Sequence, residues 1–399
     1  MPPVPLPDPA LAQAPASAPA PAAAVPEQRV TPLELFFDLV FVFAITQVTG
    51  YLTADATWIR LLEGLAILVV LWWAWECYAW LGNTAGSDEG AFRLTLLAAM
   101  GAMLIAAIAL PHAFGRDALA FGIAYCIVRI LHIVAYAILA RADRTLRVVV
   151  VILARQMVPV GLLLVVAGLV DGPLRTLCWV VAIGLDLGGL YIQGVEGWRV
   201  EAGHLAERHG LIIIIALGES IVEIGVGAEG HALDAGLIVA VLLGVATAAA
   251  LWWAYFDVVA LVAERRFRRA TGTERVLIAR DSYTYLHLPM LVGIVLFAFG
   301  VEETIAHVGD PLHDIPALGL CGGLALYFLA HVAFRLRNVH TLNRGRLLAA
   351  IVLAALVPVA TTMPALAALA IVAAICVGLV AYEFVHVHDA RERLRHALT

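Results

Sequence analysis

The sequence contains no lysine, and all 25 of its basic residues are arginines. A retinal or pyridoxal Schiff base, or a nucleophilic lysine, requires the lysine amine, so these kinds of chemistry are excluded. Charged residues of all types make up only 14% of the chain, whereas 62% of its residues are hydrophobic. A soluble domain of this composition would have too little polar surface to stay in solution.

The chain also lacks the common motifs of metal, cofactor and nucleotide sites. Its five cysteines lie inside apolar runs and form no C-x-x-C pair, so disulfide frameworks and thiolate metal sites are not expected. No phosphate-binding loop, nucleophile elbow, H-E-x-x-H motif or nucleotide fingerprint is present. His386 and His388 form an H-x-H pair, which we interpret as a solvated helix end rather than a metal site. We predict no metal, no cofactor and no nucleic-acid partner.

Long apolar runs occur along nearly the whole chain. Each run of about 20 residues can cross a bilayer as a helix, and the period-two alternation of a membrane barrel is absent. The sequence therefore predicts an all-α polytopic protein in the lipid bilayer, with about 12 transmembrane helices. The predicted spans are 33–52, 58–81, 92–110, 118–139, 148–170, 174–194, 205–227, 236–260, 276–300, 315–336, 346–362 and 364–386.

The two ends of the chain differ in composition from these spans. Residues 1–28 are rich in proline and alanine, which predicts a disordered tail, and they lack the basic start of a signal peptide. Placing the N-terminus inside puts most arginines on the cytoplasmic side, including the runs at 141–147 and 265–269. We therefore expect both termini, including a C-terminal tail at 389–399, in the cytoplasm.

Matching residues recur at nearly constant spacing in the two parts of the chain. His132 aligns with His331 at a shift of 199, and the same shift aligns an arginine and a proline farther along. Insertions in loops would change this spacing between spans but not within a span. The pattern predicts two parallel six-helix halves, 29–200 and 201–388, an architecture found in transporters. Chance matching in an Ala/Leu/Val-rich sequence is the alternative.

Carboxylates occur within several predicted spans. Residues 31–34, Thr-Pro-Leu-Glu, form a capping box that explains Glu34 without a functional role. Asp38 lies one turn deeper and has no capping role. Because a charge at mid-bilayer costs at least ~2.5–3.5 kcal/mol, Asp38 is a candidate ion or substrate ligand.

A similar pair of acids occurs in the second half. Glu219 and Glu223 are four residues apart on one helix face, and Glu219 follows a glycine that would permit close helix approach. Both are candidate ion or substrate ligands. The repeat leaves two registers open: Glu34 matches either Glu207 or the first acid of this pair.

Other polar residues within the spans could act as counter-charges or ligands. Arg129 could form a structural ion pair, Arg280 could extend to the membrane surface, and a single histidine is most simply a hydrogen-bonded core residue. The tryptophans of the LWWAW segment are interpreted as an aromatic belt at the membrane interface. The remaining candidates for ion or substrate binding are Arg129, His132, Arg155, Asp186, Arg280 and His287.

Two segments, RVTPLELFFDLVFVFAITQ and ERHGLIIIIALGESIVEIG, together with LWWAW, resemble the bacterial low temperature requirement protein A (LtrA) family. The resemblance extends from Arg29 to about Arg395. It implies a bacterial inner (plasma) membrane protein linked to growth at low temperature, without a defined activity. By motif, it implies that the signature residues are Glu34, Phe36, Phe37, Asp38, Glu207, His209, Gly210, Gly218, Glu219 and Ser220.

These observations favour a secondary transporter or a proton- or ion-coupled carrier of an unknown small solute. Asp38 and Glu219 would bind a proton or cation, and Arg129, Arg155 and Arg280 would neutralise these acids or hold an anionic solute. One alternative is a membrane-embedded enzyme acting on a lipid-like substrate. Another is a non-transporting sensor or assembly factor in which the buried charges are structural pairs. The oligomeric state is left open.

A polar cavity between the two halves would favour transport. A cleft open sideways to lipid would favour the enzyme, and closely paired charges without a cavity would favour the sensor or assembly factor.

Overall fold

The computed structural model describes residues 29–84, 90–141, 145–192, 194, 198, 200–257 and 259–386. Within these residues, eleven helices are long and apolar enough to cross a membrane. A further helix of 17 residues, Arg344–Ala360, corresponds to the remaining predicted span. The prediction of an all-α polytopic membrane protein is confirmed.

When the continuous helical stretches 272–306 and 314–339 are each taken as one helix, the spans begin and end within two turns of the predicted boundaries. Their bounds are α1 Pro32–Thr53, α2 Trp58–Thr84, α3 Gly90–Ala109, η1 Leu110–His112, α4 Ala118–Leu139, α5 Thr145–Ala167, α6 Pro173–Ile192, α7 Ala202–Ala228, α8 Ala235–Phe256, α9 Val259–Arg269, α10 Gly272–Ile278, η2 Ala279–Tyr285, α11 Leu286–Ala306, α12 Asp314–Ala317, η3 Leu318–Gly322, α13 Gly323–Val339, α14 Arg344–Ala360 and α15 Ala365–His386.

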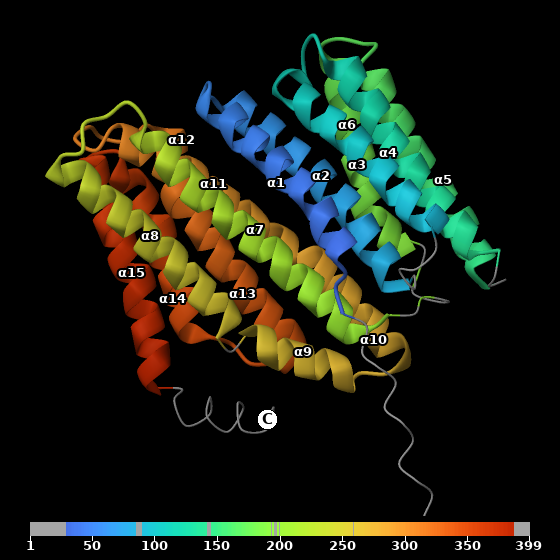
Figure 1. Cartoon of the computed structure of the whole chain (residues 1–399). Helices are drawn as coiled ribbons and strands as arrows, with labels where there is room; N and C mark the ends of the chain where they lie inside the picture. Colours follow the sequence, from blue (N-terminus) through green and yellow to red (C-terminus); the bar gives the residue numbers. More distant parts are fainter. Residues whose placement is uncertain are drawn as a thin grey trace, which may run out of the picture.

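The helices form two groups with α1, α2 and α7 between them. Figure 1 shows α3–α6 on one side and α8, α11 and α13–α15 on the other. Helix α1 packs against α2, α3, α7 and α11, so it contacts elements of both groups. We call the end of the bundle where α1 and α7 begin, and across which α9 lies, the α9 end, and the opposite end the far end (Figure 1).

Helix α1 begins with the predicted capping box. The Thr31 hydroxyl accepts a hydrogen bond from the Glu34 N–H at 3.3 Å, and the Thr31 N–H donates to Glu34 Oε2 at 2.9 Å. Pro32 occupies the first turn, where a missing N–H costs no helical hydrogen bond. These contacts fix where α1 starts and hence the depth of Asp38, one turn farther along.

Helix α9 corrects one predicted boundary. The span expected at 236–260 ends at Phe256, and the arginine-rich segment that follows is a separate helix rather than a loop. Phe267 of α9 is buried, while Arg266, Arg268 and Arg269 lie in its last turn. An amphipathic helix of this kind is suited to the membrane surface.

Small residues permit the closest helix contacts, although not at the predicted position. A Cβ atom on Gly227 of α7 would lie 2.6 Å from the carbonyl oxygen of Glu302 in α11, so this crossing requires glycine. A Cβ atom on Gly218 would have no neighbour within 4 Å. The expected role of Gly218 in close approach is therefore wrong, because this glycine lies on the exposed face of α7.

Candidate functional site

Asp38 is fully engaged by residues of two neighbouring helices. Arg208 of α7 donates to both carboxylate oxygens, each at 2.8 Å, and the indole N–H of Trp75 in α2 donates to Oδ1 at 2.9 Å. Asp38 and Arg208 are each 1% exposed. A bidentate pair of this kind has little capacity left for another cation, so Asp38 is an ion-pair residue in this conformation.

Next to the Asp38–Arg208 pair, Glu34 forms a second contact between α1 and α7. His204 Nε2 lies 3.0 Å from Glu34 Oε1, and the Asn83 amide donates to His204 Nδ1 at 3.4 Å. His204 can therefore be neutral, with its one ring hydrogen directed at the carboxylate. The capping residue thus also joins α1 to α7.

A second polar group lies deeper between α2, α7 and η2. His209 Nε2 lies 2.7 Å from Glu76 Oε1, and the Thr284 hydroxyl donates to Glu76 Oε2 at 3.1 Å. His287 lies beside it, with a ring-centroid distance of 4.9 Å to His209. Its Nε2 is 2.8 Å from the Tyr255 hydroxyl. The π-helical turn of η2, an irregularity often found at functional sites, carries Thr284 into this group.

Arg129 pairs with Asp186 within the α3–α6 group. The Arg129 guanidinium donates to Asp186 Oδ1 at 2.5 Å and contacts the Cys77 sulfur at 3.1 Å, and both charged residues are 1% exposed. His132 lies one turn away and is 2.8 Å from the Cys77 carbonyl oxygen through Nε2. Arg129 therefore forms an ion pair inside the protein, one of the two roles considered from the sequence, and it does not neutralise Asp38 or Glu219.

Three carboxylates gather nearer the far end. Glu219 Oε2 accepts from the Thr46 hydroxyl at 2.7 Å, and Glu302 Oε2 accepts from the Thr53 hydroxyl at 2.6 Å. Glu223 lies one turn along α7 from Glu219, and its carboxyl interacts with both of these carboxyls. Among the described residues, no basic side chain forms an ion pair with these acids, which are all buried.

We call Glu219, Glu223 and Glu302 the acid cluster. Like charges at such short range in a low-dielectric interior cannot all be ionised, and a hydrogen bond between two carboxyls requires a proton on one of them. The cluster is therefore suited to bind and release protons. Glu302 was not identified from the sequence, because it lies at the end of a span and next to a second glutamate, Glu303, a position at which solvent exposure is expected.

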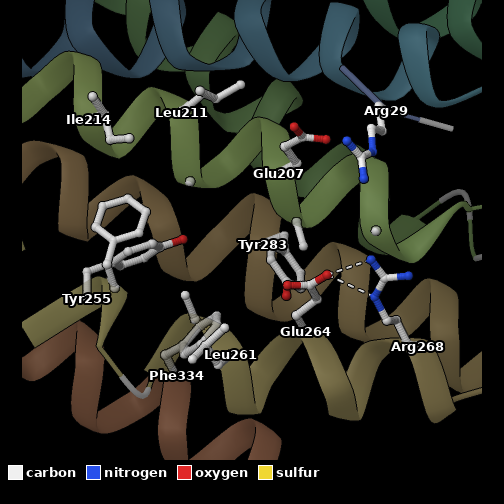
Figure 2. A pocket seen from close by; sticks show the side chains of 15 residues that line it. Arg29, Glu207, Leu211, Ile214, Tyr255, Leu261, Glu264, Arg268, Tyr283 and Phe334 are labelled. Atoms are coloured by element: carbon white, nitrogen blue, oxygen red, sulfur yellow. Dashed lines mark hydrogen bonds and ion pairs between the residues drawn. The ribbon is translucent and has the colours of Figure 1, made fainter. Parts of the chain in front are cut away.

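A pocket of about 450 Å³ opens near the α9 end, between α7, α8, α9 and η2. Figure 2 shows Glu207 and Arg29 on one side of it and the Glu264–Arg268 ion pair on the other. Its lining is otherwise aromatic and aliphatic, including Tyr283. Apart from Arg29, every lining residue belongs to 201–388, so this pocket does not lie between the predicted halves.

The remaining predicted residues lie apart from these groups. Arg155 of α5 is exposed, and Arg280 pairs with the adjacent Asp281 at 2.8 Å, so neither contacts Asp38 or Glu219. Of the family-signature residues, Phe37 is buried, whereas Phe36 is 52% exposed. Ser220 is buried, and Glu207 and Gly210 line the pocket. His388 lies outside the described residues. The described residues contain no group of three or more His, Cys, Asp or Glu side chains that could hold a metal ion.

The tryptophans of α2 do not form an interfacial belt. Trp72, Trp73 and Trp75 are at most 3% exposed, and the Trp72 indole N–H donates to the Thr284 carbonyl at 3.0 Å. All three pack inside the bundle, where Trp72 and Trp75 supply hydrogen-bond donors. Trp252 of α8, which is 45% exposed, keeps the outward position expected of a belt residue.

Arg208 was the main residue missed from the sequence. It follows the start of α7 closely, so it resembled the positive charge that usually flanks a span on the cytoplasmic side. The available signal was its spacing: Asp38 and Arg208 occupy the same position relative to the first residues of α1 and α7.

Comparison with known proteins identifies the family. The sequence matches the model of the bacterial low temperature requirement A protein over residues 29–381. The chain belongs to the LtrA family. Uncharacterized protein RA0937 of Rhizobium meliloti (strain 1021) is 30% identical over 285 residues, which cover 69% of each chain. No solved structure matches the chain.

Family membership confirms the resemblance seen in the two sequence segments. Both segments lie in the part of this LtrA protein where α1 meets α7. They supply the Asp38–Arg208 pair, Glu34 of the Glu34–His204 contact and two members of the acid cluster. The molecule is thus a bacterial multi-pass membrane protein whose family-signature segments contribute to its buried polar core.

Proposed function

We propose that this LtrA protein is a proton-coupled secondary carrier of a small solute in the bacterial inner membrane. The observation that supports this proposal is the acid cluster, three buried carboxylates without a basic partner among the described residues. Protonation removes a charge from the membrane interior, so the cluster has two states that differ in charge. Alternating access requires a two-state element of this kind.

The surroundings of the acid cluster also fit a carrier. The ten residues from His209 to Glu219 span about 15 Å of helix. The buried side chains of α1 and α7 between the acid cluster and the polar groups near the α9 end are apolar. This layer consists of Phe41, Ile45, Ile212, Ile213 and Ala216. A proton could cross it only if the helices move, and such a barrier is what couples proton movement to a conformational change.

The packing of the helices supports two related halves. Helix α1 packs on α3 as α7 packs on α11, and the consecutive contacts from α3 to α6 recur among α11, α13, α14 and α15. The capping residues Thr31 and Glu201 are 170 residues apart, as are the partners in the Asp38–Arg208 pair. This spacing of 170 residues favours an alignment of the two halves that differs from both alignments considered from the sequence.

The pocket in Figure 2 is our candidate for the solute site. Its volume of about 450 Å³ lies within the usual range of small-molecule sites. Its rim carries charges of both signs, from Arg29, Glu207, Glu264 and Arg268. Because α9 places several arginines at this end, we assign the α9 end to the cytoplasm, which puts both termini there.

The test is proton flux in proteoliposomes that contain the full chain and an internal pH dye. Flux would be driven by an imposed potential, with and without mixtures of small solutes. We expect flux from the wild type and its loss in Glu219→Gln and Glu223→Gln. The matched control is Glu229→Gln, at an exposed residue just beyond α7, which should retain flux.

A non-transporting membrane protein is the second candidate. It is favoured by the complete pairing of Asp38 with Arg208 and by the buried Arg129–Asp186 pair, because both are structural contacts in this conformation. Absence of flux from well-folded wild-type protein across a broad panel of solutes would favour this candidate over the carrier.

A further inference from the structure

His209 forms two ring contacts that both require a hydrogen on the ring or on its partner. Nδ1 lies 2.8 Å from the carbonyl oxygen of Leu205, and Nε2 lies 2.7 Å from Glu76 Oε1. A carbonyl oxygen only accepts hydrogen bonds, so Nδ1 must carry a hydrogen. In a neutral ring, Nε2 would then present a lone pair to an ionised carboxylate. The contact of 2.7 Å therefore needs one additional proton between the two groups.

The other contacts of Glu76 locate this proton. Thr284 accepts a hydrogen bond from the Trp80 indole N–H at 3.0 Å, and its own hydroxyl hydrogen is directed at Glu76 Oε2, 3.1 Å away. Oε2 therefore already accepts a hydrogen bond. The additional proton belongs to the contact between Oε1 and Nε2.

We propose that Glu76 and His209 form a second proton-binding site, separate from the acid cluster, and that this site is occupied in the conformation described. The two residues share one proton, either as an imidazolium beside a carboxylate or as a neutral ring beside a carboxylic acid. In both forms the pair has no net charge. Loss of the proton would leave a bare carboxylate at a position that is only 3% exposed.

The groups that face the pair do not supply a compensating charge. His287 directs Nδ1 at a backbone carbonyl and Nε2 at a tyrosine hydroxyl, so it can be neutral. Tyr283 contacts the His209 ring at a centroid distance of 5.2 Å. Asp38 and Arg208 neutralise each other. Cys77, next to Glu76 in sequence, contacts the guanidinium of the Arg129–Asp186 pair, which is itself neutral overall.

The role of this site in transport rests on the proposed carrier function, whereas its protonation does not. Glu76 and Thr284 line a cavity of about 40 Å³, which has room for a water molecule that could deliver or remove the proton. The site lies about 15 Å along α7 from Glu219, on the other side of the apolar layer. In a carrier, it would hold the coupling proton on the cytoplasmic side.

The test is the protonation state of His209 in the full chain in lipid bilayers. Nitrogen-15 NMR of histidine-labelled protein resolves ring protonation, and subtraction of the His209→Gln spectrum assigns the signal. At neutral pH we expect His209 in the wild type to carry hydrogen on both nitrogens, or one hydrogen together with an infrared band of protonated Glu76. In Glu76→Gln we expect one hydrogen only, because the glutamine amide can donate to Nε2.

The control is Glu34→Gln, which alters the neighbouring His204 contact and should leave the His209 signal unchanged. A singly protonated His209 beside an ionised Glu76 in the wild type would overturn the proposal. Proton flux separates this site from the carrier function. If the wild type transports and Glu76→Gln transports equally well, the transport role of the site is wrong. If the wild type does not transport but the pair is protonated, the carrier proposal fails and the proton site stands.

Discussion

Asp38 and Arg208 allow a quantitative test of whether this pair is structural. Each residue is 1% exposed, and the two share two hydrogen bonds of 2.8 Å. Removing one partner from a buried ion pair leaves an uncompensated charge and costs about 3–5 kcal/mol. We therefore expect Asp38→Leu and Arg208→Met each to lower the free energy of unfolding by about that amount.

The double variant should be much less damaging than the two single variants together. Replacing both charges by apolar side chains removes the need to bury either, and such replacements are often close to neutral. The remaining loss comes from the Trp75 N–H, whose acceptor is removed, at about 1–3 kcal/mol. This is far below the sum of about 6–10 kcal/mol for two independent losses.

Unfolding by SDS in mixed micelles, followed by tryptophan fluorescence, would measure these free energies for the wild type, both single variants and the double variant. The four values form a double-mutant cycle and give the coupling energy directly. Additive single effects, or a single Asp38→Leu that costs less than about 1 kcal/mol, would refute the argument that the pair is buried and mutually neutralising.

Two further predictions follow from matched pairs of residues. Gly227→Ala should lower the unfolding free energy by about 1–3 kcal/mol, because the new methyl group would meet the Glu302 carbonyl at 2.6 Å, whereas Gly218→Ala should cost nothing measurable in the same assay. Arg129→Met should cost about 3–5 kcal/mol by stranding the Asp186 charge, whereas Arg155→Met, on an exposed face, should change stability by less than about 0.5 kcal/mol. Equal effects within either pair would contradict the packing described.

Much of the fold followed from apolar run length alone. A helix must cross the hydrocarbon layer, so runs of about 20 residues located the spans, and the capping box located the first residue of α1. The amphipathic helix α9 was missed as a helix because its arginines resemble an ordinary basic loop. The π-helical turn of η2 left no comparable signal in composition.

The sequence predicted several residues of the candidate site, but it did not predict which residues pair with each other. Asp38, Glu219 and Glu223 were recognised because a carboxylate inside an apolar run needs an explanation. Their partners depend on how helices far apart in sequence are rotated and packed, which periodicity within one helix does not specify. A structural ion pair was considered for Arg129, but Asp186 was not identified as its partner, and the inward direction of Trp75 was not foreseen.

The central claim is that the acid cluster holds a proton at neutral pH, and infrared spectroscopy tests it most directly. Protonated carboxyls give a carbonyl stretching band that carboxylates lack. We predict this band in wild-type protein in lipid bilayers at neutral pH, the loss of the acid cluster's part of it in Glu223→Gln and its full retention in Glu229→Gln. A wild-type spectrum in which no part of the protonated-carboxyl band disappears in Glu223→Gln would contradict the claim.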